Sequence, residues 1–598
     1  MSLGIAARVV LGIGVMLASV CMVANEAHPA GDTVCPDATG GEPALRKCSP
    51  RIVDLLASPQ PPATLLVWIF IADRPRGGIE AGRAAGVRSS SGVHLPSEAV
   101  SRRLARAHAA YDDHYLPVHG AYIDALRSRI IKLRHVSSYF NAVSAVVATS
   151  ELPAISAYPF VERIEQVAVF SSRVEPPPYV GRPSGARAVA SPAAEGYGGS
   201  IYQLDQIWVI PLLEKGYNGS GTVSGNAPVH IGVLDTGFNR DHAAFSHVTV
   251  DAEWDFVQGD AVTRNEPGDL PNQDEHGTWV LGVIAGYAPG RLIGPAWGAH
   301  YFLAKTEIAN VRDERVEEDN WVAGIEWADT NGADIVTSSL AFKDWYTRGD
   351  LDGQTALCTR AADIIASHGV IVVNSAGNSG ILGLVAPADG DSVFSIGAVD
   401  RLGTIASFSS RGPTADGRIK PDFVAMGVDA WTVSASDPTA YRGDLDGTSF
   451  SGPLFAGGCA LLLEMHPDWD PAKVREELRA TASNSGSPDN TYGWGIPNFQ
   501  LAGGCTSAAV PPGAFPNPFV DMTKLQFFYR SPQLVTVRVY DCRGALVRTL
   551  ASNEPKYCAW DLSWDGTSDA GAAVTPGVYF VAVTTNSTKT TFKLIRIR

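Results

Sequence analysis

The sequence has 598 residues, of which 45% are hydrophobic and 18% charged, a balance typical of chains that bury cores and unlike that of disordered proteins. A formal net charge of −15 argues against nucleic acid or an anionic membrane as a partner, because phosphates are bound by clustered cations. The length predicts several domains rather than one.

The N-terminus carries an apolar run that is typical of an export signal. Arg8 precedes the run Val9–Val20, and a short cationic start followed by ~15 apolar residues matches a secretory signal peptide. We therefore predict a signal peptide over residues 1–27, a secreted or cell-surface protein, and no transmembrane anchor there, since the run is too short for a comfortable span. Cys21 leaves a lipoprotein as the alternative, although the residues before it fit a lipobox poorly.

Composition and periodicity then predict an α+β unit between two flexible segments. Residues 28–61 are rich in Pro, Gly and Ala, and so are residues 176–200, which is linker composition. Between them, residues 62–175 alternate apolar β-type runs with helical patterns. The expected elements are strands at 64–71, 139–148 and 161–170, helices at 98–110 and 121–134, and a short helix after Ser150.

The central part of the chain, residues 201–503, has the pattern of an α/β domain. Short, continuously apolar runs alternate with Ala- and Gly-rich helical stretches, which favours a parallel sheet buried on both faces by helices. The runs are 229–234, 334–340, 369–373 and 393–398. Because ligands of such sheets bind beyond the carboxyl ends of the strands, we expect the chemistry at those ends.

The last part of the chain is predicted to be all-β. A linker over 504–514 precedes residues 515–598, in which apolar and polar residues alternate with a period of two, as in Val535, Val537 and Val539. About 85 residues of short strands with turn signals between them predict a small β-sandwich.

Three polar segments lie at the ends of predicted strands or at the start of predicted helices. They are Asp235-Thr236-Gly237, Glu275-His276-Gly277-Thr278 and Gly447-Thr448-Ser449. Serine is a weak nucleophile, so an imidazole must take its proton, and a buried carboxylate must hold that imidazole in one tautomer. Asn378 follows another strand, where its side-chain amide can donate to an oxyanion.

In this order along the chain, the segments resemble those of the subtilisin-like serine proteases, over residues 201–503. The resemblance implies that Asp235 orients His276, that His276 is the general base and then the acid, and that Ser449 attacks the peptide bond to form an acyl-enzyme. Asn378 and the Ser449 backbone N–H would form the oxyanion hole. The residues expected to flank the substrate polypeptide are Ser339, Leu340, Ala341, Ser375, Ala376 and Gly377.

The resemblance extends to both flanking units. Residues 62–175 resemble an inhibitor-type propeptide with a ferredoxin-like fold, partly through Tyr139-Phe140-Asn141, which implies a precursor that processes itself and is inhibited by its own propeptide. Residues 515–598 resemble Ig-like domains of bacterial exported proteins and type IX sorting domains. They imply a partner in the secretion machinery or attachment to the cell surface.

Other interpretations of these residues stay open. Asp235-Thr236-Gly237 could mark an aspartic protease, but that chemistry needs two such carboxylates and no second copy occurs. An esterase needs the same triad, and an inactive protease scaffold could serve adhesion. The repeated Arg-Gly-Asp-Leu-Asp-Gly at 348–353 and 442–447 is interpreted as two loops.

No metal site or cofactor is predicted. The sequence lacks CxxC and HExxH patterns, and the spacing of Asp241, His242 and His247 matches no metal motif, so we expect His242 to be a surface residue. Structural calcium is possible for this family but is not indicated by the residues.

Overall fold

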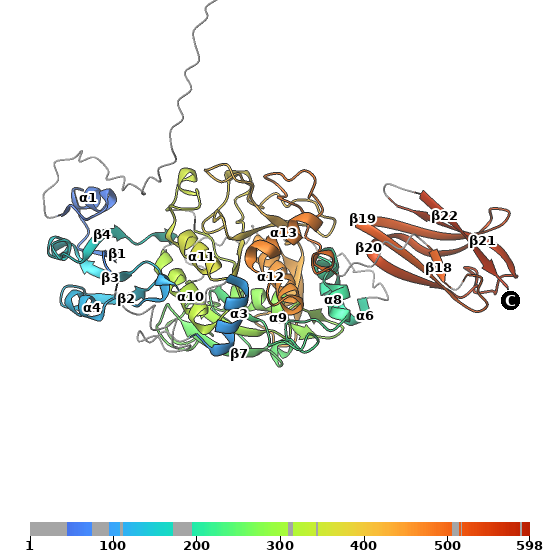
Figure 1. Cartoon of the computed structure of the whole chain (residues 1–598), viewed down its shortest axis with the longest axis horizontal. Coiled ribbons are helices and arrows are strands. Elements are labelled where there is room, and N and C mark those ends of the chain that lie inside the picture. The colour runs from blue at the N-terminus through green and yellow to red at the C-terminus, as the bar shows by residue number, and fades with distance from the viewer. Residues whose placement is uncertain are drawn as a thin grey trace, which may run out of the picture.

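The computed structural model describes three folded units, arranged from one end of the molecule to the other (Figure 1). The predicted signal peptide, residues 1–27, lies outside the described residues. No helix in the described part of the chain is both long and apolar enough to span a membrane. The described residues are 45–74, 95–107, 112–171, 194–308, 315–342, 345–504, 513–515, 517–585 and 589–597.

The N-terminal unit is a four-stranded antiparallel sheet with helices against it. The strand order β2-β3-β1-β4 places the first strand in the centre, as in a ferredoxin-like fold, so the predicted α+β class is confirmed. Alternate side chains of β1 reach two different cores, with Val67 and Ile69 in the core of this unit. The elements are α1 (Pro50–Leu56), β1 (Thr64–Ile71), α3 (Ser97–Ala107), η2 (Asp113–Tyr115), α4 (Gly120–Arg127), β2 (Lys132–Ser137), β3 (Ala142–Ala148), α5 (Leu152–Ser156), β4 (Val161–Gln166) and β5 (Val169–Ser171).

Two expectations for this unit differ from the structure. The helix expected over 121–134 ends at Arg127, and residues 132–137 form β2 instead, because pairing with β3 outweighs the local helical preference. The lead-in expected over 28–61 contains α1, and the Ser49 N–H donates to the carbonyl of Ile164 in β4 at 2.8 Å. The folded unit therefore begins before residue 62.

The central unit is built on a seven-stranded parallel sheet with helices on both faces. Its strand order is β15-β14-β13-β12-β6-β10-β7. Ile335 of β12 packs in the core under α9 and α12, whereas its neighbour Val336 packs in the core under α10 and α11. The strands are thus buried on both faces, which explains their unbroken apolar runs and confirms the predicted α/β class.

The bounds of the central elements are as follows. The sheet strands are β6 (His230–Asp235), β7 (Thr249–Asp255), β10 (His300–Lys305), β12 (Ile335–Ser338), β13 (Ile371–Ser375), β14 (Phe394–Val399) and β15 (Phe423–Met426). The helices and outlying strands are α6 (Ala194–Tyr197), α7 (Ile201–Gln206), α8 (Ile210–Glu214), α9 (Glu275–Ala285), β11 (Arg315–Glu317), α10 (Glu318–Asn331), α11 (Leu357–Ser367), β16 (Ala430–Val433), β17 (Tyr441–Leu445), α12 (Thr448–Met465), α13 (Pro471–Thr481) and α14 (Phe499–Ala502).

The central unit starts earlier than the predicted boundary at residue 201. Residues 194–200, part of the linker expected over 176–200, form α6 and a 3-10 turn. The Gly199 N–H donates to the carbonyl of Arg291 at 3.1 Å, and the buried Ser200 hydroxyl accepts from the Ile293 N–H at 2.9 Å. This end of the expected linker is therefore part of the folded unit.

The C-terminal unit is all-β with antiparallel pairing, as predicted. Its strands are β18 (Gly513–Phe515), β19 (Thr523–Asp541), β20 (Leu546–Trp564), β21 (Gly577–Thr584) and β22 (Lys589–Arg596). Strand β19 is long enough to pair with β18, β20 and β21, so one hydrogen-bonded network joins the five strands. Their inward side chains, among them Val537 and Trp564, form a separate core.

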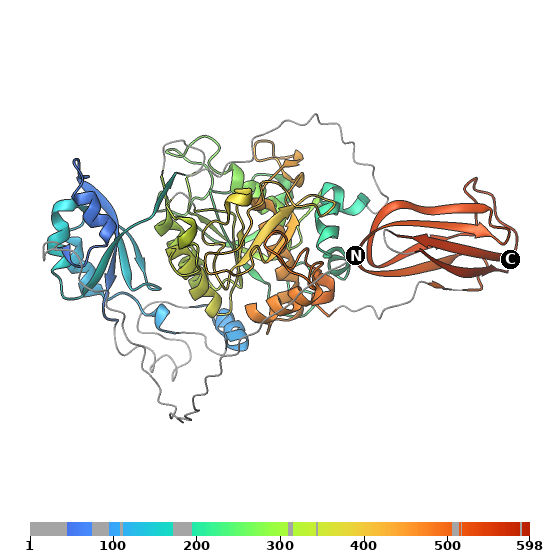
Figure 2. The same cartoon turned by 90° about the horizontal axis from the view of Figure 1, so that it is seen from above.

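The N-terminal unit packs on the helical face of the central unit that is formed by α10 and α11 (Figure 2). Arg134 of β2 forms an ion pair with the buried Asp319, with 2.7 Å between Nε and Oδ2. Strand β5 pairs with β11 in antiparallel register, Phe170 opposite Val316. Helix α3 adds a second contact, since Arg102 and Arg106 each approach a carboxylate oxygen of Asp334 to 2.7 Å.

Candidate active site

Asp235 and His276 meet at the carboxyl edge of the parallel sheet. Asp235 is the last residue of β6 and is fully buried, and His276 is the second residue of α9. The two atoms His276 Nδ1 and Asp235 Oδ1 lie 2.7 Å apart. The Thr236 N–H also donates to Oδ1, at 2.8 Å. Because a carboxylate only accepts, Nδ1 carries a proton and Nε2 is left as the basic nitrogen.

The electrostatics of the pair favour a charged imidazole. Burial lowers the pKa of His276, but the Asp235 carboxylate, with Glu307 and Glu275, more than offsets this, so the pKa of the imidazole is raised. A histidine in this setting can accept a proton during a reaction and hold it beside its partner.

Ser449 is the second residue of α12, at the same edge of the sheet. Pro453 lies inside this helix, and its missing N–H would otherwise donate to the carbonyl of Ser449, four residues earlier. Proline in the first turn of a helix costs no hydrogen bond, but Pro453 lies one turn further on, so the Ser449 carbonyl loses its helical donor. The Ser339 hydroxyl fills the gap by donating to the Ser449 carbonyl at 3.0 Å.

Asn378 is fixed beside the same turn. Its Oδ1 accepts from the Thr448 N–H at 3.0 Å and from the Thr448 hydroxyl at 2.9 Å. A backbone N–H can only donate, so this contact determines which end of the amide is oxygen. The Nδ2 end is therefore free to donate elsewhere. It lies beside Gly447, since a Cβ built on that glycine would be 3.7 Å from Nδ2.

The six residues expected to flank the substrate lie after two adjacent strands. Ser339, Leu340 and Ala341 follow β12, and Ser375, Ala376 and Gly377 end or follow β13, its neighbour in the sheet. Ser375 and Gly377 also contact Thr448, the residue before Ser449. The Ser375 hydroxyl donates to the Thr448 carbonyl at 3.1 Å, and the Gly377 N–H to the Thr448 hydroxyl at 3.3 Å. Gly377 has φ 102°, which disfavours any side chain there.

Two features of the site were missed from the sequence. Glu307 is buried two residues after β10, and burial, with a contribution from Asp235, raises its pKa to about 8. It follows a strand end at the same edge as Asp235, a signal that could have identified it. The other feature is β11, which offers its edge to a further strand. Its own residues do not reveal this, because the pairing is with β5, which is far away in the sequence.

Smaller expectations also differ from the structure. The second Arg-Gly-Asp-Leu-Asp-Gly copy, expected as a loop, lies largely in β17, which pairs with β16. His242, expected on the surface, is buried, with its Nε2 2.8 Å from the carbonyl of Ala440.

The described residues hold three groups of side chains with metal-binding chemistry. One is acidic, formed by Asp255, Asp260 and Glu266, and it already has a cation beside it, since Lys305 Nζ lies 2.7 Å from Asp255 Oδ2. The other two each combine two histidines with an aspartate. They are Asp112, His114 and His368, and His230, Asp251 and His300.

Known proteins are similar to each of the three units. Residues 226–495 match the family described as "Subtilase family", residues 67–177 "Peptidase S8 propeptide domain, Bacteroidota", and residues 528–589 "FlgD Ig-like domain". Subtilisin from Bacillus pumilus is 31% identical over 308 residues, which cover 50% of this chain and 98% of that protein. Subtilisin E from Bacillus subtilis (strain 168) is also 31% identical over 308 residues, with 70% of its length covered. Alkaline protease from Alkalihalobacillus alcalophilus is 27% identical over 373 residues, covering 62% of this chain and 82% of its own.

Proposed function

The chain belongs to the subtilase family and is a serine endopeptidase with a propeptide, and on that premise we propose that Asp235, His276 and Ser449 are its catalytic triad. We propose further that it is exported as a precursor and cuts itself. The contact that carries the triad assignment is the 2.7 Å approach of His276 Nδ1 to the buried Asp235 Oδ1. It leaves Nε2 as the base for the Ser449 hydroxyl.

The reaction then follows from these groups. His276 takes the proton of the Ser449 hydroxyl as its oxygen attacks the substrate carbonyl, and gives that proton to the leaving amine. The Asn378 amide and the Ser449 backbone N–H donate to the oxyanion that forms. Asn378 is suited to this role because Thr448 holds its oxygen end, so no reorganisation is needed during the reaction. The acyl-enzyme is hydrolysed by water in the reverse order, and no cofactor enters the steps.

The propeptide indicates how a substrate polypeptide would bind. Strand β5 lies antiparallel to β11, with Ser171 opposite Arg315, so the edge of β11 accepts an extended chain. A substrate would take the same path, between β11 and the segments after β12 and β13. The first bond cut in the precursor should therefore lie shortly after Ser171 and before the folded peptidase unit, whose described residues begin at 194.

The test is Ser449→Ala in the full chain, since replacing a hydroxyl by hydrogen removes the nucleophile and leaves the turn intact. We expect this variant to resist fluorophosphonate labelling and to accumulate as an uncut precursor, while the wild type is labelled and separates into two pieces. Ser487→Ala, at an exposed serine, is the matched control and should behave as wild type. A wild-type protein that is not labelled would contradict the triad, and Ser449→Ala cut at the same bond and rate would contradict self-processing.

A further inference from the structure

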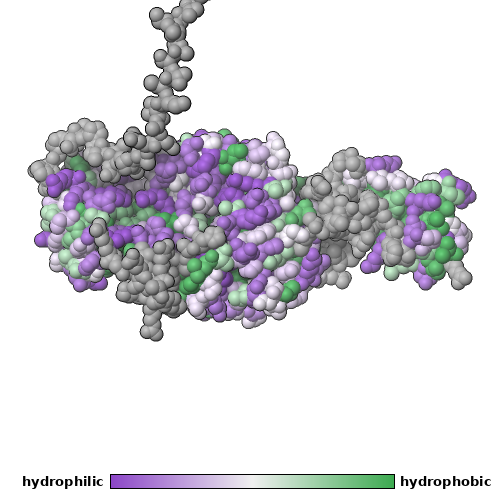
Figure 3. All heavy atoms as spheres, in the orientation of Figure 1, coloured by the Kyte–Doolittle hydropathy of each residue, from purple (hydrophilic) through white to green (hydrophobic). Residues whose placement is uncertain are grey.

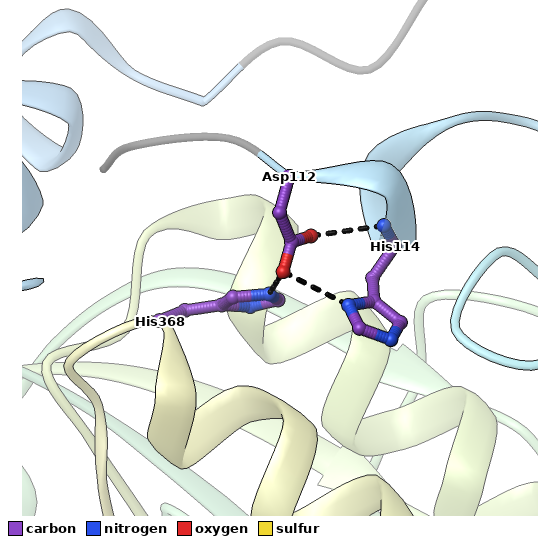
Figure 4. Close-up of side chains that lie close together, drawn as sticks. All are labelled: Asp112, His114 and His368. Atoms are coloured by element: carbon purple, nitrogen blue, oxygen red, sulfur yellow. Dashed lines mark hydrogen bonds and ion pairs between the residues drawn. The ribbon is translucent and has the colours of Figure 1, made fainter. Parts of the chain in front are cut away.

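Three side chains converge where the propeptide meets the peptidase unit (Figure 4). Asp112 and His114 come from the propeptide, at the 3-10 turn η2, and His368 directly follows α11 of the peptidase unit. Asp112 Oδ2 lies 2.9 Å from His114 Nδ1 and 3.3 Å from His368 Nε2. The two partners of the carboxylate in this cluster thus belong to different units.

The spacing of these atoms fits a divalent metal ion. Zinc takes imidazole nitrogen and carboxylate oxygen at about 2.0–2.1 Å in tetrahedral geometry, which places ligand atoms about 3.3 Å apart. The ligand atoms of Asp112, His114 and His368 all lie within 4.8 Å of one another. Asp112 and His114 are partly exposed, so an ion and a water as fourth ligand have access from solvent.

A second feature that points to a metal is the buried carboxylate beside the other ring nitrogen of His368. This nitrogen, Nδ1, is 2.9 Å from Oδ2 of Asp329, a fully buried carboxylate. Tyr139 donates to the same oxygen at 2.6 Å, and Arg103 Nη2 donates to the Asp329 backbone carbonyl at 2.7 Å. The Tyr115 hydroxyl is also near His368 Nδ1, at 3.0 Å. Metal-binding histidines are held in this way, since a carboxylate on one nitrogen directs the other toward the ion.

The carboxylate of Asp112 is oriented by a backbone N–H two residues further along the chain. Asp112 Oδ1 accepts from the His114 backbone N–H at 2.9 Å, which turns Oδ2 toward the two imidazoles. In the other trio with two histidines, the partner of the second ring nitrogen is a cation instead of a carboxylate: His230 Nδ1 lies 3.3 Å from Arg102 Nη2, which can only donate, and 3.7 Å from Asp334 Oδ2.

We propose that Asp112, His114 and His368 bind one divalent transition-metal ion, of the kind that Zn²⁺ represents, and that this ion links the propeptide to the peptidase unit. Since two ligands come from one unit and one from the other, the ion binds the docked arrangement better than the separated one. It therefore stabilises the inhibited precursor by linkage. The proposal goes beyond the proposed catalytic roles and requires only that the two units dock as described.

The experiment uses the full chain with Ser449→Ala, which keeps both units on one chain, and without a polyhistidine tag. Zn²⁺ is titrated by calorimetry, and Co²⁺ is used to report ligand geometry through its visible absorption. We expect one equivalent to bind with micromolar affinity or better, and a tetrahedral Co²⁺ spectrum. In the same background, His114→Ala and Asp112→Asn should each weaken Zn²⁺ binding by about tenfold or more.

The matched control is His300→Ala, which removes a histidine from the other trio and should leave the affinity unchanged within about twofold. Saturating Zn²⁺ should raise the melting temperature of the Ser449→Ala chain but not of its His114→Ala derivative. His114 is partly exposed, so the metal-free melting temperature should be preserved, which separates lost binding from lost folding. The proposal is overturned if Zn²⁺ does not bind stoichiometrically, if His114→Ala binds as tightly as its parent, or if the loss follows His300→Ala. None of these readouts depends on peptidase activity, so a negative metal-binding result would leave the proposed triad unaffected.

Discussion

The Asn378 side chain is fixed at one end and free at the other. Thr448 donates twice to Oδ1, at 3.0 and 2.9 Å, and this leaves Nδ2 free for the proposed role as donor to the developing oxyanion. Such a donor is used only as charge develops, so its removal should affect the transition state more than the bound substrate.

We therefore expect Asn378→Ala to lower kcat by about 10²–10³ and to leave KM within about twofold. Steady-state kinetics on a peptide substrate measure both constants. Thr448→Val, which keeps the backbone donor and loses the hydroxyl, should give a smaller decrease in kcat. A kcat for Asn378→Ala within threefold of wild type would rule out the oxyanion role.

Glu326 connects propeptide docking to pH. It lies on α10 and accepts from the Ser138 N–H at 3.0 Å and from the hydroxyls of Ser137 and Ser138, all from the propeptide. Burial raises its pKa to about 7. When the propeptide leaves, the carboxyl gains water and its pKa returns toward the usual value of about 4.3.

The sign of the effect follows from these two states. The docked form holds the proton up to pH ~7, whereas the separated form loses it above pH ~4.3, so separation releases a proton between those values. Docking is therefore favoured at low pH and weakens as the pH rises to 7. We expect the separated fraction of cut propeptide, measured by gel filtration, to increase from pH 5 to 7. In Glu326→Gln, which stays neutral, this Glu326-dependent increase should disappear. An equal slope in both proteins would exclude Glu326 as the titrating group.

At the scale of elements, α12 is held at close range by its neighbours. A Cβ on Gly458 would lie 2.4 Å from the ring of Phe499 in α14, closer than atoms can approach. Gly486, in a loop, has nothing within 4 Å of the same added atom. The absence of a side chain at residue 458 is thus a condition for packing α12, and with it Ser449, on α14.

Gly458→Ala should destabilise the peptidase unit by about 1–3 kcal/mol through overpacking. Its melting temperature should fall by several degrees, while Gly486→Ala should change the free energy of unfolding by no more than about 0.5 kcal/mol. Differential scanning calorimetry of the two variants makes the comparison. Equal melting temperatures would mean that Phe499 moves aside at no cost.

The elements also indicate how far the sequence predicts this structure. The strands of the parallel sheet, such as the one that contains Val336, were predictable. A strand buried on both faces is continuously apolar, whichever strands it pairs with. Strand β2 was not, because residues 132–137 become a strand only through pairing with β3. The pairing of β5 with β11 joins segments far apart in the chain, and the same is true of Asp112 and His368, 256 residues apart. Local patterns therefore predicted the classes of the units and the candidate catalytic residues, but not the contacts between units.

At the scale of the whole molecule, the C-terminal unit is separate from the peptidase unit. The hydrogen bonds and ion pairs described for residues 513–597 join its own strands, and Phe519 and Trp564 belong to its own core. Hydrophobic side chains appear on its visible face in Figure 3, and the exposed hydrophobic residues of this unit include Leu546, Val578 and Phe580. An exposed apolar surface on an independent unit is suited to binding a partner.

We expect truncation after Gly504 to leave the peptidase folded and active, because the helices around Ser449 take their packing from residues before that point. The purified truncated enzyme should keep kcat/KM for a peptide substrate within about twofold of the full chain, and its melting transition for the peptidase unit should be unchanged. What should change is the fraction of enzyme exported or kept at the cell surface, measured by fractionating cells that express each form. The matched control is the full chain with Gly577→Ala, a change at the first residue of β21 where an added Cβ meets nothing closer than the carbonyl oxygen of Thr575 at 3.9 Å. If the truncated enzyme were unfolded or inactive after purification, the C-terminal unit would have to belong to the peptidase fold, and if its distribution between medium and cells matched the full chain, it would not serve export or attachment.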